Sequence, residues 1–451
     1  MPSTVGPARG RWRSGSGFLL AALGSAIGLG NIWRFSYVAG ENGGGAFLIV
    51  YLAVVFLVGI PLLLGELALG RSAQRESAAA FEALAPASRW RHLGWLGVIV
   101  AGLILAYYGV IAGWVLKYLW VHLSGSTQIL AAAGFPAGFR DFIAHPVEPI
   151  AWQFAAMLLT TAIVALGVDR GIETVSKWLM PVMGLLMVGL ALHSITMPGF
   201  QRGVDFLFRP DWAALARPEV YLAALGQAFF SIGLAMGVMV TYGSYVDEDR
   251  RLPRAAAAIA IGDSLFAVMA GLVIFPAVFS FGLDPAQGPA LAFVVLPEVF
   301  TAMAGGAWIG AAFFALLAIA AVTSAVSLLE VTVAFAMHRF GWSRARASLS
   351  LGGLIFVLGI PTSLGYGPWA GITFPGGRAI LDAVDFIAAD VLLPLNGLLI
   401  AVFLGWVWKR HDALQACGLS TGPLGWLWRF NLRYVVPLLV LLVLAQGFVR
   451  A

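Results

Sequence analysis

The sequence is poor in cysteine and in charged residues, and both shortages limit what the chain can be. A single cysteine, Cys417, among 451 residues excludes an internal disulfide and a cysteine-based metal cluster. Only 11% of the residues are charged, whereas a soluble chain is normally about a quarter charged. The six histidines are scattered and show no metal-ligand spacing. These features argue against a soluble enzyme and against a disulfide-rich secreted domain.

Long apolar stretches take the place of the missing charge. Hydrophobic residues make up 60% of the chain, and the mean hydropathy is +0.90. Stretches of about 20 apolar residues recur throughout, which is typical of an all-α polytopic membrane protein. No cleavable signal peptide is expected, because the first apolar run continues without a small-residue cleavage site. We predict eleven spans, at about 15–37, 44–70, 94–122, 150–168, 174–195, 219–242, 255–281, 305–338, 345–364, 380–408 and 430–449.

The basic residues predict the orientation of these spans. The net charge of +5 alone would be compatible with nucleic-acid binding, but most of the 27 lysines and arginines fall in alternate loops between spans. Such a bias marks the cytoplasmic side. We therefore predict a multi-pass protein of the bacterial inner or plasma membrane, with a cytoplasmic N-terminus, a lipid bilayer around it and no nucleic-acid partner. The sequence does not indicate an oligomeric state.

Two spans contain residues that interrupt a membrane helix. Residues 24–35 read GSAIGLGNIWRF, and residues 227–237 read QAFFSIGLAMG. Each glycine weakens a helix by about 1 kcal/mol, and polar groups at membrane depth require partners. Glycine-rich spans also arise from close helix packing. However, interrupted spans at the starts of two five-span halves indicate a transporter site at the bilayer midplane.

Other polar residues within the spans are candidates for the same site. Asp263, a carboxylate inside the seventh span, either binds a cation, pairs with a base or titrates. Thr323 and Ser324 either bond back to their own helix or supply oxygen ligands to a cation. Glu66 and Glu330 are either functional or structural partners of interrupted backbone.

At this point the motifs resemble a known family. Residues 11–71, beginning RWRSGSGFLLAALGSAIGLGNIWRF, look like the first two helices of the neurotransmitter:sodium symporters, in particular of the bacterial, leucine-transporter-like branch. The resemblance continues through GQAFFSIGLAMGVMVTYGSYV, AVTSAVSLLE and DAVDF, and it covers nearly the whole chain. It implies one transporter domain, 1–451, with a 5+5 inverted repeat and broken helices 1 and 6. The repeats would span about 12–196 and 218–408, followed by an additional helix 11 at about 430–449.

The resemblance also implies two sodium sites. The first would use the carbonyl of Ala26 with the side chains of Asn31, Ser231 and Asp263. The second would use the carbonyls of Gly24, Ile27 and Ala320 with the hydroxyls of Thr323 and Ser324.

A substrate pocket and two gates are implied in the same way. The pocket residues would be Ala26, Gly28, Leu29, Gly30, Ile104, Tyr108, Phe230, Ser231, Gly233, Met236, Ser324 and Leu328. Arg34 and Asp385 would form the outer gate, with Phe230 closing over the substrate and Tyr108 holding its carboxylate. Arg9, Trp12 and Tyr245 would belong to the inner gate.

Three features depart from the usual family pattern or add to it. Asp263 stands where chloride-dependent members commonly have Asn, so its carboxylate would supply the negative charge and chloride would not be required. His338 stands where the inner gate usually has Asp, which leaves the inner latch undefined, either weaker or dependent on pH. Gly171 and Pro181 flank nine residues at the start of span 5 and predict a segment that unwinds to let water reach the second sodium.

The pocket residues predict the substrate class. Gly28 occupies the position where monoamine transporters carry Asp, so the substrate is expected to bring its own carboxylate. Its side chain would face apolar residues, which favours hydrophobic L-amino acids imported by sodium-coupled alternating access. The alternatives are another small carboxylated solute, a transporter-like sensor or a channel. No nucleophile–base pair, metal cluster or phosphate loop supports an enzyme.

Overall fold

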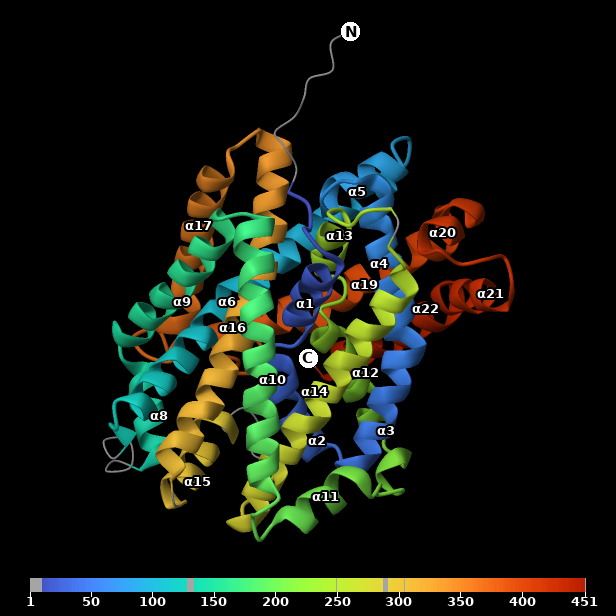
Figure 1. Cartoon of the computed structure of the whole chain (residues 1–451). Coiled ribbons are helices and arrows are strands. Elements are labelled where there is room, and N and C mark those ends of the chain that lie inside the picture. The colour runs from blue at the N-terminus through green and yellow to red at the C-terminus, as the bar shows by residue number, and fades with distance from the viewer. Residues whose placement is uncertain (1–9, 128–133, 249, 287–290, 304, 451) are drawn as a thin grey trace.

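The computed structural model of the chain is a bundle of helices (Figure 1), and it describes residues 10–127, 134–248, 250–286, 291–303 and 305–450. Within these ranges the only β-structure is two isolated bridges, Gly44 with Pro210 and Phe374 with Arg378. All of the predicted spans fall on helices. The predicted all-α membrane fold is therefore confirmed.

The first five spans occupy the first half of the chain. Span 1 consists of α1, η1 and α2, span 2 of α3, η2 and α4, span 3 of α6, span 4 of α9, and span 5 of η4 and α10. Shorter helices α5, η3 and α8 lie between them. The bounds are α1 Gly15–Ala26, η1 Gly30–Arg34, α2 Phe35–Glu41, α3 Gly45–Val54, η2 Val55–Gly59, α4 Ile60–Ala73, α5 Ser77–Leu84, η3 Arg89–His92, α6 Leu93–Leu123, α8 Phe135–Ala144, α9 Glu148–Ala165, η4 Val168–Glu173 and α10 Thr174–Ser194.

The remaining spans follow in the same manner. Span 6 consists of α12 and α13, spans 7 to 9 of α14, α16 and α17, span 10 of α18 to η8, and span 11 of η9 and α22. The bounds are α11 Phe200–Phe208, η5 Ala214–Ala216, α12 Pro218–Ile232, α13 Val238–Gly243, α14 Leu252–Ser280, η6 Leu291–Val295, α15 Leu296–Ala302, α16 Gly306–Phe340, α17 Arg344–Leu364, α18 Ile380–Asp385, η7 Phe386–Leu392, α19 Leu393–Val402, η8 Phe403–Val407, α20 Arg410–Cys417, α21 Pro423–Phe430, η9 Asn431–Val435 and α22 Val436–Arg450.

Spans 1 and 6 are interrupted, as the sequence predicts. The two halves of span 1 meet at an angle of 50°. In span 6, Gly233, Ala235 and Gly237 all have positive φ, of 70°, 62° and 74°. Two buried side chains hold this strained backbone, because Glu66 accepts from the Ala235 amide at 2.8 Å and Asn396 donates to the Ala235 carbonyl at 2.6 Å. Glu66 therefore has a structural contact with interrupted backbone, one of its two predicted roles.

The broken spans lie inside the bundle, where longer helices cover them. α1 packs against α10, α14 and α16, while α16 packs along α6. The short helices α5, α13 and α20 lie at the end of the bundle from which the N-terminus emerges, and α8, α11 and α15 lie at the opposite end (Figure 1). We call these two ends the N-terminal side and the distal side. A ligand held at the breaks would therefore lie between the N-terminal side and the distal side.

Candidate functional site

A buried carboxylate lies beside the break in span 1. Asp263 on α14 accepts from the Asn31 amide at 2.6 Å, the Ser231 hydroxyl at 2.8 Å and the Tyr51 hydroxyl at 3.2 Å. All four side chains are at most 2% exposed. The Asn31 oxygen in turn accepts from the Gly28 amide at 2.9 Å, within the break. Spans 1, 2, 6 and 7 thus converge on one carboxylate.

This cluster has oxygen atoms but no basic side chain in an ion pair with Asp263 among the described residues. Burying an unpaired carboxylate is strongly unfavourable, so the site suits a cation. The basic residue nearest in sequence to Asn31, Arg34, instead donates to Gln227 at 2.8 Å, while Gln227 donates to the Gly30 carbonyl at 2.8 Å. A hard cation with oxygen ligands, such as sodium, therefore fits the donor set around Asp263.

A second group of oxygen atoms lies between α1 and α16. Ser324 donates to the Ser25 carbonyl at 3.2 Å, and the hydroxyls of Ser25 and Ser327 are 2.8 Å apart. Thr323 donates to its own helix, to the carbonyls of Ile319 at 2.9 Å and Ala320 at 3.1 Å. A Cβ placed on Gly24 would lie 3.4 Å from the Thr323 Cβ. Gly24 and Thr323, one predicted second-site residue from each helix, are therefore neighbours across the helix pair.

A narrow cavity of about 30 Å³ lies between these clusters. Glycines open it, because a Cβ on Gly28 would be 2.6 Å from the Ser324 hydroxyl and one on Gly30 would be 2.9 Å from the Phe230 ring. Tyr108 reaches the break from α6, with its hydroxyl 3.5 Å from the Leu29 amide. Eleven of the predicted pocket residues line the cavity: Ala26, Gly28, Leu29, Gly30, Ile104, Tyr108, Phe230, Gly233, Met236, Ser324 and Leu328.

A larger cavity of about 210 Å³ lies on the distal side of the first one. Phe230 lines both cavities, as do Leu29, Gly30 and Tyr108, so the two cavities meet at these residues. Arg34 and Asp385 also line the larger cavity, yet no direct ion pair joins them in the part of the chain described. The Arg34 guanidinium instead lies 5.1 Å above the Phe230 ring. The predicted outer gate residues thus share a cavity without closing it.

On the N-terminal side, Trp12 closes the path. Its indole nitrogen donates to the Tyr242 carbonyl at 3.1 Å, and its ring lies edge-on to Tyr242 and Tyr245 at 5.1 and 6.1 Å. Trp12 is only 6% exposed. This contact joins the N-terminal segment to the end of span 6. Arg9, the other predicted residue of this gate, lies outside the described residues.

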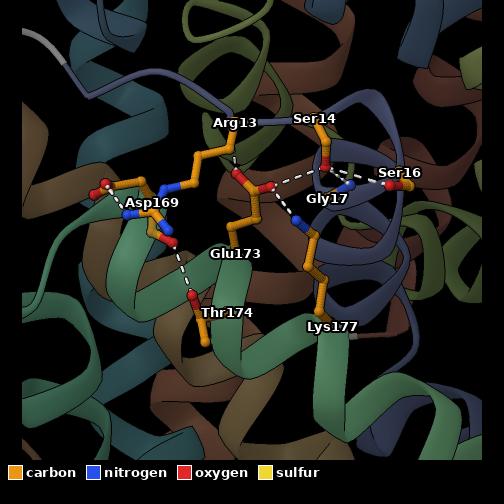
Figure 2. Close-up of polar contacts among 8 residues, drawn as sticks. All are labelled: Arg13, Ser14, Ser16, Gly17, Asp169, Glu173, Thr174 and Lys177. Atoms are coloured by element: carbon orange, nitrogen blue, oxygen red, sulfur yellow. Dashed lines mark hydrogen bonds and ion pairs between the residues drawn. The ribbon is translucent and has the colours of Figure 1, made fainter.

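The next residues attach the N-terminal segment to the start of span 5 (Figure 2). Glu173, whose side chain is fully buried, accepts from the Arg13 backbone amide at 2.7 Å, the Ser14 hydroxyl at 3.0 Å and the Lys177 ammonium at 2.6 Å. The Arg13 guanidinium pairs with Asp169 at 2.8 Å. The residues between Gly171 and Pro181 are helical in this structure. Their predicted unwinding would be a change of conformation and stays a prediction.

A third network on the N-terminal side joins spans 6, 8 and 9. Arg344 contacts Glu330 through two nitrogens, at 2.6 and 3.0 Å, and Tyr245 donates to the same carboxylate at 2.7 Å. Glu330 is thus paired with two side chains and not with the interrupted backbone that was the structural alternative for it. His338, the residue in the usual Asp position, lies 3.4 Å from Glu76, which directly precedes α5. Glu330 is accordingly the acid that Tyr245 contacts.

The structure also places residues near the site that sequence reasoning missed. Ser25, Val238 and Ser327 line the narrow cavity although they were not assigned to the pocket. The position of Ser25 beside Gly24 at the break was a usable signal. Ser231, predicted to line the pocket, instead faces Asp263 within the carboxylate cluster. Gly24, Ile27, Asn31, Ala320 and Thr323 lie beside the cavity rather than among the residues that line it.

The sequence and the fold are both similar to those of known proteins. The model of the sodium:neurotransmitter symporter family matches residues 9–129 and 143–451. A sodium-dependent transporter of Bacillus subtilis, YhdH, is 42% identical over 96% of each chain, and one of Haemophilus influenzae is 31% identical over 96% of this chain and 97% of that one. The crystal structure of MhsT in complex with L-phenylalanine matches with a TM-score of 0.92 at 51% identity, over 98% of this chain and all of that one.

Proposed function

Because this chain belongs to the sodium:neurotransmitter symporter family, we propose that it is a sodium-coupled importer of hydrophobic L-amino acids that works by alternating access. Its relatives are sodium-dependent transporters, and the solved structure of MhsT holds L-phenylalanine. The observation that carries the proposal is the cavity at the two breaks. It combines bare glycine backbone and hydroxyls at one end with apolar side chains around the rest.

The polar end of this cavity suits an amino-acid carboxylate. No acidic side chain lines the cavity, so nothing there would pair with an amine-only substrate. The Gly28–Gly30 backbone, together with the Tyr108 hydroxyl, offers donors to an anion at an interrupted helix. The side chain of the substrate would then face Ile104, Met236 and Leu328. Because the cavity is smaller than a large side chain, binding requires Phe230 to move toward the distal cavity.

We propose that two sodium ions are transported together with the substrate and drive its import. The Asp263 cluster supplies a negative charge and several oxygens, and the Ser324 region supplies neutral oxygens. One charge moved through about 100 mV releases about 2.3 kcal/mol, and a tenfold sodium gradient adds about 1.4 kcal/mol per ion. Two ions therefore supply about 7 kcal/mol, enough for about five decades of accumulation of a neutral amino acid.

The second part of the proposal is that transport does not require chloride. The Tyr51 and Ser231 hydroxyls, which the family resemblance assigns to a chloride site, both contact the Asp263 carboxylate here. Gln227, the third such residue, is engaged by Gly30 and Arg34. The carboxylate thus takes the donors that an anion would need. It would also supply the charge that balances sodium.

Uptake into proteoliposomes tests both parts. A panel of labelled amino acids is offered with sodium or choline outside, and sodium is supplied as chloride or as gluconate. We expect saturable, sodium-dependent uptake of Leu, Phe, Tyr or Trp at equal rates with either anion. Uptake of glycine or GABA but of no apolar amino acid would overturn the substrate class. Loss of uptake in gluconate that chloride restores would overturn chloride independence.

Binding measured on the same protein separates transport from sensing. Sodium-dependent binding of an apolar amino acid without accumulation in the vesicles would identify a sensor and contradict the import function. Flux that does not saturate with substrate would identify a channel. Only saturable accumulation that collapses when the sodium gradient is dissipated agrees with the proposal.

A further inference from the structure

The N-terminal side of span 11 carries an arginine cluster that the transport site does not use. Arg429 on α21 and Arg433 on η9 are one helical turn apart. Arg410, at the start of α20, lies close enough to act on Arg429, and the pKa of Arg429 is lowered by burial and then by these two cations. These three residues are called the Arg429 cluster below. The helices α20 and α21, which carry two of these arginines, lie at the edge of the bundle (Figure 1).

The guanidinium groups of this cluster have unused hydrogen-bond donors. Arg429 makes one long contact, to the Trp408 carbonyl at 3.4 Å, and its other terminal nitrogen is buried without a partner. The Nε atom of Arg433 is buried without a partner as well. None of the three arginines forms an ion pair within the described part of the chain. Other cations on the same side behave differently, since Arg13 pairs with Asp169 and Arg344 with Glu330.

Exposed aromatic rings surround the cluster. Trp426, Phe430 and Tyr434 recur every four residues along one helix face, with successive ring centroids 5.2 and 5.3 Å apart. Trp406 of span 10 lies 5.7 Å from Tyr434, and the Arg433 guanidinium lies 3.8 Å above the Trp406 ring. These four rings are between 39% and 57% exposed. Exposed Trp and Tyr beside arginine are typical of the level of the lipid headgroups.

Beyond these rings, the exposed side chains of α22 that the structure describes are apolar. Leu438, Leu441 and Leu442 on α22 are all more than 50% exposed. A ligand lying along this face would therefore meet cations at one end and aliphatic side chains at the other. A phospholipid has this order of groups along its length.

We propose that the Arg429 cluster binds the phosphate of an anionic phospholipid, whose acyl chains lie along α22. Guanidinium groups match phosphate oxygens in charge and geometry, so the unpartnered donors of Arg429 and Arg433 find acceptors there. Three cations that form no ion pair among the described residues repel the ammonium of a zwitterionic headgroup, which favours a lipid such as phosphatidylglycerol over phosphatidylcholine. The site lies on the side that the basic loops predict to be cytoplasmic, where anionic lipids attract basic clusters.

Lipid titration of the purified full chain in a neutral detergent tests this site. Short-chain phosphatidylglycerol, short-chain phosphatidylcholine and inorganic phosphate are added separately, and bound molecules are counted by native mass spectrometry. We expect saturable binding of phosphatidylglycerol and at least tenfold weaker binding of the other two. The double variant Arg429→Gln/Arg433→Gln should weaken phosphatidylglycerol binding about thirtyfold, given the usual attraction per basic residue.

Arg346→Gln is the matched control, because Arg346 is also an arginine on the N-terminal side that lies 4.8 Å above a tryptophan, Trp342. It should leave binding unchanged. If the double variant does not fold, the preference of the native protein for phosphatidylglycerol, together with the single variant Arg433→Lys, still decides the matter. Equal binding of both lipids, equal loss in Arg346→Gln, or binding of inorganic phosphate as tight as that of phosphatidylglycerol would each overturn the proposal.

Discussion

Replacing Glu173 by glutamine is expected to detach the N-terminal segment from span 5 and open the N-terminal side of the protein. The buried carboxylate accepts three hydrogen bonds, two from the N-terminal segment and one from Lys177 (Figure 2). Glutamine has one acceptor oxygen, and its amide would face the Lys177 ammonium. The variant therefore removes the buried negative charge at this contact and leaves donors unpaired.

The size of the effect follows from the exposure of the partners. A hydrogen bond to a charged group contributes about 1.5–3 kcal/mol. Ser14 and Lys177 are partly exposed and regain water when they are released, so the three bonds do not add fully. We take about 2 kcal/mol for the contact as a whole, which shifts the closed-to-open equilibrium about thirtyfold. Arg13→Gln should have a smaller effect, below about 1 kcal/mol, because the Arg13–Asp169 pair is half-exposed and the backbone bond to Glu173 persists.

Cysteine labelling measures this equilibrium. Ala22, on α1, is fully buried, so a cysteine placed there by Ala22→Cys reacts with a water-soluble maleimide only when the N-terminal side opens. We expect the labelling rate to rise about thirtyfold in Glu173→Gln and about fivefold or less in Arg13→Gln.

Glu148→Gln provides the matched control for this experiment. Glu148 pairs with Lys117 on the distal side, so the same chemical change is made away from the contact in question. Its labelling rate should equal that of the parent. The reasoning is refuted if Glu173→Gln labels at the parent rate, or if Glu148→Gln accelerates labelling equally, because either result would show that Glu173 does not hold the segment specifically.

Three further predictions concern other parts of the chain. Asp263→Asn should abolish sodium-dependent uptake in gluconate, and chloride should restore that uptake in part by replacing the lost charge. If the variant takes up substrate in gluconate at the wild-type rate, the prediction is wrong. Asn396→Ala should leave the Ala235 carbonyl without its donor, lowering the free energy of unfolding by about 1–3 kcal/mol and the melting temperature in detergent, whereas an unchanged melting temperature would argue against its role. Burial raises the pKa of Cys417, so the native thiol should stay unlabelled by maleimide at pH 8 while the protein is folded, and rapid labelling would show that α20 is not packed as described.

The sequence predicted those features of the fold that depend on the residues of a single span. Glycines and a buried Asn in one apolar run were sufficient to place the break in span 1, and the second run with Gly233 and Gly237 placed the break in span 6. The positive φ of Ala235 was not predictable, because alanine rarely adopts this conformation. It persists here because Glu66 and Asn396, from spans 2 and 10, hold its two backbone groups. A local sequence pattern does not reveal contacts between residues that lie far apart in the chain.

The N-terminal gate shows the same limit. The family resemblance predicts the acid of this gate at position 338, where this chain has His338. The acid that contacts Tyr245 is instead Glu330, about two turns earlier on α16, and its basic partner Arg344 comes from the next span. Glu173 was not singled out at all, although it fastens the N-terminal segment to span 5. Each of these pairs joins residues from different elements, so their partners become evident only once the helices are packed.

The two ends of the transport path are held by different interactions, and this difference determines what a substrate has to accomplish. On the N-terminal side, the buried Glu173 and Glu330 carboxylates are each paired with a cation. On the distal side, Arg34 and Asp385 share a cavity without an ion pair among the described contacts. A ligand can shift such an equilibrium only by its difference in affinity for the two states. That difference has to come from groups that move, and Phe230, which lies where the two cavities meet and beneath the Arg34 guanidinium, is a side chain so placed. An apolar substrate side chain that contacts Phe230 would favour closure of the distal side, whereas a solute that contacts only the glycine backbone would bind without favouring it.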